Sequence, residues 1–218
     1  MNILAPRLPE TLTPVENFAE FVRLLIAEDQ RIAQISAQKE QCERADFFKM
    51  DIAGSAFDGC SFHKCCFEKA SFVDAEFRGC DFSNCNFQGA YFERCRFADC
   101  KCIGIDFVGA MVKHTLFSQC NLQYANLNTV KLVSVRFQGV DFSDASMAEA
   151  KLTRFSADDT RFIRNDLSKT MLAGIDFSGN VLIAPTLSSP PVELKGIVID
   201  MLQAPDLVGL LGVKVKQP

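Results

Sequence analysis

The chain has 218 residues, a net charge of −4 and 48% hydrophobic residues, which is an ordinary balance for one or two folded domains. The acidic surplus argues against direct binding of nucleic acid through phosphate contacts. No apolar run approaches the ~20 residues that span a bilayer, and the N-terminus lacks the pattern of a secretory signal. We therefore expect a cytoplasmic protein without membrane contact, in which the ten cysteines stay reduced.

The first segment with a clear pattern is TLTPVENFAEFVRLLIAED, residues 11–29. Thr13 has the chemistry of an N-cap, Pro14 suits a first helical position, and Glu16 completes a capping box. These signals predict a helix over 14–27 that covers one end of the following domain. Its apolar face is formed by Phe18, Phe21, Val22, Leu25 and Ile26.

Residues 28–44 allow two interpretations. Ile32, Ala37 and Cys42 are spaced by five residues, as in the segment that follows, which would make this stretch an imperfect first coil. RIAQISAQKEQ would equally extend the helix. We assign residues 1–44 to an N-terminal helix and cap.

A repeat of five residues dominates the chain from 45 to 184. Of the 28 positions 47, 52, 57 and so on to 182, sixteen are Phe and nearly all others are large and apolar, with Ala157 too small. The position two residues earlier is mostly Ala, Cys or another small residue, with Phe155 as the bulky exception, and the residue between is often Asp or Asn. A period of five fits neither a helix nor a strand, but it fits a coil that turns a right angle every five residues. Stacked coils would then bury one continuous core.

The cysteines follow the same register, although FDGCSFHKCCFEKASF (57–72) resembles a metal site at first reading. Cys60 and Cys65 take small inward positions on different sides, while His63 points outward and Cys66 lies in the polar position. Such side chains do not converge on one tetrahedral centre. We predict no metal and no cofactor, and an interior ladder of thiols formed by Cys60, Cys80, Cys100 and Cys120.

The sequence also lacks the motifs of common enzymes. There is no GxSxG, no Walker A loop and no HExxH, and GIDFVGA (104–110) lacks the helix that would make it a phosphate cradle. We therefore predict no catalytic residues and no enzymatic activity.

The repeat over 45–184 resembles the pentapeptide repeat family, which forms a right-handed quadrilateral β-helix. The resemblance implies an all-β solenoid over residues 45–187, with seven coils and a height of roughly 34 Å at ~4.8 Å per coil. The unbroken register leaves no room for a loop that projects from the solenoid.

After SSPP (188–191), the remaining residues predict a strand near 197–199, a helix over 201–211 and a strand over 213–216. Asp200 would cap this helix and Gly212 would end it, while Pro205 favours a shorter helix over 205–211. Together with the solenoid, the run Leu-Gly-Val-Lys-Val at 211–215 resembles Qnr-type proteins, whose C-terminal module forms a homodimer. The resemblance implies a dimerisation module over 188–218. Its candidate interface residues are Leu202, Val208, Leu210, Leu211, Val213 and Val215.

Qnr-type and related proteins protect DNA gyrase and topoisomerase IV from quinolones or peptide toxins as rod-shaped dimers that imitate B-DNA. The resemblance implies DNA gyrase or topoisomerase IV as partner; the alternative is a solenoid scaffold for another protein. Outward charges support an acidic side only weakly, since the repeat carries 17 acidic and 15 basic residues. The sides through Phe72 and Phe62 carry net charges of +2 and +1, respectively. The side through Phe57, Phe77 and Phe97 is the candidate partner-binding face, with Asp58, Glu76, Asp99, Asp158, Asp159 and Asp176.

Overall fold

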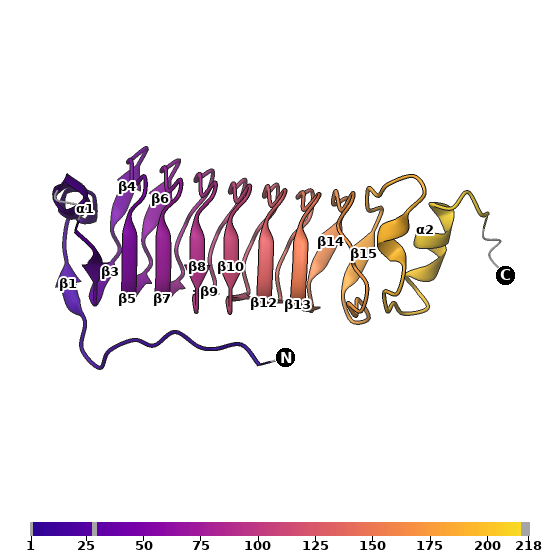
Figure 1. Ribbon diagram of the computed structural model, residues 1–218, viewed down its shortest axis with the longest axis horizontal. Coiled ribbons are helices and arrows are strands. Elements are labelled where there is room, and N and C mark those ends of the chain that lie inside the picture. The colour runs from indigo at the N-terminus through magenta and orange to yellow at the C-terminus, as the bar shows by residue number, and fades with distance from the viewer. Residues whose placement is uncertain (1, 28–29, 215–218) are drawn as a thin grey trace.

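The computed structural model describes residues 2–27 and 30–214 as a right-handed β-solenoid of about eight turns (Figure 1). Strands in neighbouring coils pair in parallel, and partners are twenty residues apart along the repeat, as in Phe57 with Phe77. At ~4.8 Å per coil the stack is roughly 38 Å tall. The elements are β1 (Thr13–Val15), α1 (Phe18–Ala27), β2 (Ile32–Ala33), β3 (Ile35–Gln38), β4 (Gln41–Glu43), β5 (Asp51–Asp58), β6 (Ser61–His63), β7 (Ser71–Arg78), β8 (Tyr91–Glu93), β9 (Arg96–Ala98), β10 (Met111–Lys113), β11 (Leu116–Ser118), β12 (Lys131–Gln138), β13 (Lys151–Asp158), β14 (Arg161–Ile163), β15 (Val181–Ile183), the 3-10 helix η1 (Val192–Leu194) and α2 (Ala204–Gly209).

The turn of the coil is visible in the backbone at every fifth residue. From Gln34 to Ala184, each residue whose number ends in 4 or 9 has a positive φ, between 47° and 78°. This left-handed conformation costs an L-residue other than glycine about 1–2 kcal/mol. Most of these positions are not glycine, so the stacked core has to offset that cost. The unbroken series also confirms that no loop interrupts the solenoid between 34 and 184.

The Asp and Asn residues of the repeat stabilise the turns. The Oδ1 atoms of Asp81, Asn86 and Asp106 each accept a hydrogen bond from the backbone N–H two residues later, at 2.8–3.0 Å. Short polar side chains favour such turns because they replace a backbone acceptor locally. This contact explains why the position before the large apolar residue is so often Asp or Asn.

The large apolar position points inward, as predicted. Phenylalanine rings one coil apart lie nearly parallel, with centroids 4.6 Å apart for Phe67 and Phe87 and 4.9 Å for Phe72 and Phe92. Rings on adjacent sides of one coil meet edge to face, as in Phe77 and Phe82 at 86°. Offset stacks and edge-to-face pairs are the favoured arrangements of aromatic rings. The core is therefore a column of phenylalanines that runs through the N-terminal half of the solenoid.

Seven of the ten cysteines fill the small inward position, as predicted. Cys60, Cys80, Cys100 and Cys120 are all at most 2% exposed and form a column in which neighbouring thiols interact, while Cys66 is only partly buried. The thiols of Cys80 and Cys100 hydrogen-bond within this column, which together with burial raises the pKa of each to about 12. The Sγ atoms face neighbouring backbone carbonyls, so these residues serve as packing groups.

One coil exchanges its large and small positions. Phe155 occupies the small inward position and is 8% exposed, whereas Ala157 occupies the position that Phe fills elsewhere. The Phe155 ring contacts Phe137 at 5.2 Å and 83°, so it reaches into the space that Ala157 leaves empty. Two apparent departures from the repeat thus compensate each other within three residues.

The predicted start of the N-terminal helix is wrong. Thr13–Val15 forms strand β1, which pairs with β3, and helix α1 begins only at Phe18. The Thr13 N–H donates to the Gln34 carbonyl at 2.8 Å, so Thr13 is not an N-cap. Asn17 takes that place, with its carbonyl accepting from the N–H groups of Glu20 and Phe21. Pairing with the solenoid edge here outweighs a local capping signal.

Helix α1 lies against the first coils of the solenoid. Phe18 and Val22 are fully buried, and the Phe18 ring lies 5.3–5.7 Å from Phe47, Phe57 and Phe62. Of the two interpretations of residues 28–44, the imperfect coil holds for the described part. Strands β2, β3 and β4 pair with β5 and β6, so coiling begins ahead of residue 45.

The C-terminal segment keeps less regular structure than predicted. In place of the strand near 197–199, only Val198 bridges to Asp176, and α2 spans Ala204–Gly209 instead of 201–211 or 205–211. Asp200 is not the N-cap of α2, which is Gln203; its Oδ1 instead accepts from the N–H groups of Leu202 and Gln203, at 2.8 and 3.0 Å, in the turn before the helix. Val213 and Lys214 are not in a strand, and the rest of the predicted strand over 213–216 lies outside the described residues.

Candidate functional site

The six predicted acidic residues lie along one side of the solenoid. Asp58 and Glu76 come from β5 and β7, and Asp99, Asp158, Asp159 and Asp176 follow at the same place in later coils. Five of the six are exposed, and Glu76 is partly buried. The side spans six coil spacings, roughly 29 Å at ~4.8 Å each. This strip of carboxylates, which has a gap between Asp99 and Asp158, is called the acidic side.

Arginines interrupt the acidic side. Glu76 Oε1 lies 3.9 Å from Arg78 and 3.7 Å from Arg96, and Asp158 lies 3.7 Å from Arg136. Among the described residues, the other four acidic side chains form no ion pair. At Asp176, hydrogen bonds from the hydroxyl and N–H of Ser178 hold the pKa of the carboxyl below its usual value. Negative charge therefore concentrates at the two ends of the strip.

The N-terminal segment is a feature that sequence analysis missed. Residues 2–12, here called the strap, run back along the outside of the coils in extended form (Figure 1). Ile3, Leu4, Ala5, Pro6 and Leu8 line a shallow hollow together with Glu76, Cys95, Arg96 and Leu116 of the solenoid. The strap thus lies along one edge of the acidic side. The apolar, proline-containing sequence of residues 2–12 is the signal that could have indicated an extended segment packed on the solenoid.

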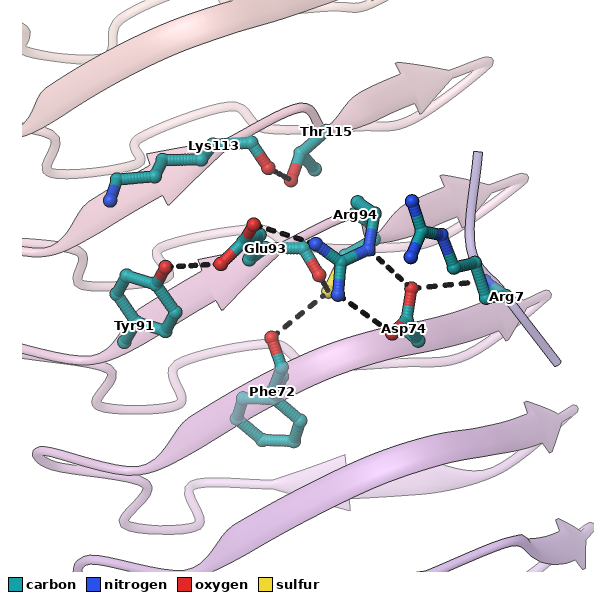
Figure 2. A network of polar contacts seen from close by, with 9 residues as sticks. Arg7, Phe72, Asp74, Tyr91, Glu93, Arg94, Lys113 and Thr115 are labelled. Atoms are coloured by element: carbon teal, nitrogen blue, oxygen red, sulfur yellow. Dashed lines mark hydrogen bonds and ion pairs between the residues drawn. The ribbon is translucent and has the colours of Figure 1, made fainter. Parts of the chain in front are cut away.

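The strap is anchored by a polar network (Figure 2). The Arg7 N–H donates to Asp74 Oδ1 at 3.0 Å, and Arg94 donates from Nε and Nη2 to the two Asp74 oxygens at 2.6 and 2.8 Å. Arg94 also donates to Glu93, which accepts from the Tyr91 hydroxyl. The Asp74 and Arg94 side chains are only 15% and 16% exposed, so this ion pair is better shielded than a typical surface pair.

The network shifts the pKa values of its members. Burial disfavours the charged form of Asp74, but hydrogen bonds from Arg94 and the Arg7 N–H outweigh it and lower the pKa of this carboxyl. Burial and the hydrogen bond to Glu93 raise the pKa of Tyr91 to about 12. The same hydrogen bond, with Arg94 nearby, lowers the pKa of Glu93. Asp74, Glu93 and Arg94 are therefore charged at neutral pH, while the Tyr91 hydroxyl keeps its proton.

The C-terminal end exposes apolar side chains. Leu207 is buried against the last coil, whereas Leu202 is 89% and Leu211 61% exposed. Met201, Leu210 and Val213 are also exposed, and Val208 is partly buried. Val215, the last predicted interface residue, lies outside the described residues. So much exposed apolar surface at one end is typical of a contact surface.

Comparison with known proteins shows which family has this repeat. The sequence matches the description "Pentapeptide repeat region" over residues 50–127 and 70–146, and "Pentapeptide repeats (8 copies)" over 141–179. The chain belongs to the pentapeptide repeat family. Its fold is accordingly that of a repeat-protein scaffold. A search among curated protein sequences finds no match.

Solved pentapeptide repeat structures share the architecture. A trypsin-treated variant of QnrB1, a plasmid-mediated fluoroquinolone resistance protein, is 22% identical with a TM-score of 0.65 over 86% of this chain and 100% of its own. Full-length QnrB1 is 21% identical, with a TM-score of 0.53 over 92% of this chain and 95% of its own. HetL, involved in heterocyst differentiation regulation in the cyanobacterium Nostoc, is 21% identical, with a TM-score of 0.45 over 85% of this chain and 98% of its own. Within the described residues, no helix is long and apolar enough to cross a membrane.

Proposed function

We propose that this pentapeptide repeat protein is a non-enzymatic, cytoplasmic DNA mimic that binds DNA gyrase or topoisomerase IV and protects it from quinolones or topoisomerase-targeting toxins. The observation that carries the proposal is the fold shared with QnrB1 over most of both chains. The straight acidic side supports it, because a strip of fixed carboxylates can replace a row of DNA phosphates in a basic channel.

Dimerisation through the C-terminal end completes this proposal. Two stacks of about eight turns joined end to end would form a rod of roughly 76 Å, comparable with ~22 base pairs at ~3.4 Å each. The exposed Leu202, Leu210, Leu211 and Val213 supply the apolar surface that such a joint needs.

The test is a gyrase supercoiling assay with a quinolone present. The purified protein should restore supercoiling, and Asp58→Lys with Asp158→Lys should abolish the rescue by reversing charge on the acidic side. Glu68→Lys with Glu149→Lys makes the same charge change elsewhere and should leave the rescue intact. Lack of rescue by the wild-type protein at any concentration would refute the proposed activity.

The second candidate is a scaffold that docks another protein through α1. Leu24 favours it, because this side chain is 58% exposed on the helix that caps the solenoid. Removing α1 would uncover Phe47, Phe57 and Phe62 of the solenoid core, so Leu24→Asp is the cleaner variant. Under this candidate, Leu24→Asp abolishes partner capture while gyrase supercoiling is never affected.

A further inference from the structure

Opposite charges stack regularly on the surface of this solenoid. Basic side chains reach a carboxylate in the adjacent coil, because residues twenty positions apart lie side by side. Seven ion pairs between 2.6 and 3.9 Å follow this rule: Arg31–Asp51, Arg94–Asp74, Lys101–Asp81, Arg164–Asp144, Lys169–Glu149, Arg96–Glu76 and Arg161–Asp141. Cross-coil pairing is thus the ordinary way in which this fold accommodates its charges.

Lys131 and Lys151 break the rule. They are direct partners in the parallel pairing of β12 and β13, and both are exposed. At the turn positions, two more like-charged pairs lie twenty residues apart, but one member of each forms an ion pair, Arg44 with Glu43 and Lys69 with Glu68. Among the strand and bridge partners of the described residues, Lys131 with Lys151 is the one like-charged pair. Neither lysine forms an ion pair with a described residue. Like charges placed opposite each other destabilise a sheet, so the fold gains nothing from this arrangement.

Two further cations extend the positive charge over the same side. Lys113 Nζ lies 5.2 Å from the centre of the Tyr91 ring, and no ion pair joins it to its strand partner Glu93. Arg154 is exposed, and its Nε donates to Ser134 Oγ at 2.9 Å. We call Lys113, Lys131, Lys151 and Arg154 the basic face. Their neighbours on this side in the same coils, such as Met111, Val133 and Thr153, are uncharged.

We propose that the basic face binds the phosphate backbone of a nucleic acid. Its charges come from successive coils at ~4.8 Å spacing on a rigid, straight surface, which fits a polymer with regularly repeated anions. Three of the four are lysines, which contact phosphates as point charges without needing a shaped pocket. The net charge of −4 indicated no such binding for the chain as a whole, but local charge decides where a phosphate backbone can lie.

The test is fluorescence anisotropy of a labelled duplex DNA with the full chain and no topoisomerase, so its outcome is independent of the proposed function. We expect salt-dependent binding, with a log–log slope of about −3 to −4 for four phosphate contacts. Lys131→Glu with Lys151→Glu should weaken binding at least tenfold. Lys39→Glu with Lys64→Glu makes the same charge change at exposed cations on other parts of the surface, and should weaken it less than twofold.

A stability measurement separates binding from folding. Lys151→Glu alone replaces the like-charged contact with an opposite-charged one, so it should maintain or raise the melting temperature while it weakens DNA binding. No binding at low salt, or an equal loss in the control variant, would overturn the proposal. So would binding to polyglutamate or to phosphatidylserine vesicles without binding to the duplex, since the occupant would then be a protein or a membrane.

Discussion

The guanidinium of Arg94 donates two hydrogen bonds to the carboxylate of Asp74 in the adjacent coil, and the same carboxylate accepts a hydrogen bond from the Arg7 N–H of the strap. One aspartate thereby joins two coils and an N-terminal segment 67 residues away in sequence. The Arg164–Asp144 pair has the same two-bond geometry at another corner, without a strap bound to it. The two pairs form a natural comparison of an anchoring and a purely surface ion pair.

Asp74→Asn should loosen the strap. A hydrogen bond to a charged group contributes about 1.5–3 kcal/mol, so its loss raises the open population of the strap roughly tenfold or more. The measurement is limited trypsin digestion after Arg7, which is exposed but held in place in the closed strap. Asp144→Asn should leave the cleavage rate unchanged. Equal rates in the wild type and Asp74→Asn would show that the strap is held by its apolar contacts alone.

Phe155→Ala should destabilise the solenoid by about 3–5 kcal/mol, because the cavity beside Ala157 then has no side chain to fill it. Ala157→Phe alone should cost about 1–3 kcal/mol by overpacking the same space. The double variant restores the regular order of large and small residues, so we expect it to regain most of the loss. Urea unfolding measures all three, and a double variant no better than Phe155→Ala would contradict the compensation.

Thiol reactivity should single out Cys66. Nine of the ten cysteines are buried, and burial raises the pKa of Cys95, for example, to about 12, so few thiolates form at pH 8. In the native protein we expect about one thiol to react with a colorimetric disulfide reagent within minutes. The Cys66→Ser variant should lose this fast phase, and denaturant should release the remaining thiols. Several fast-reacting thiols in the native state would show that the coils open locally.

Leu211→Asp should convert the proposed dimer into a monomer, because it places a charge in the exposed apolar surface at the C-terminal end. Sedimentation velocity distinguishes the two species directly. Leu24→Asp introduces the same change at the opposite end and should not alter the sedimentation coefficient. A monomeric wild type would disprove the dimerisation module.

The sequence by itself determined the solenoid. The five-residue period over 28 positions is compatible with one buried core, because burial of Phe and Leu away from water is favourable and each repeat directs this residue to the inside of the coil. The inward direction of Cys60 and Cys65 and the position of the acidic residues on one side follow from that register alone. The hydrogen bonds from Asp200 to the turn before α2 were also readable, since they depend only on neighbouring residues.

Only the tertiary structure decided the remaining features. Thr13 and Pro14 have the local signals of a helix start, but the open edge of β3 offers hydrogen bonds that a helix start cannot match. Phe155 and Ala157 look like two errors in the repeat until their shared space is seen. The strap depends on Asp74, which no local pattern connects to Arg7. For Thr13 and Arg7, a partner distant in sequence supplies the free energy, and a periodic sequence does not indicate which residue that partner is. For Phe155, the packing against Phe137 in the adjacent coil decides.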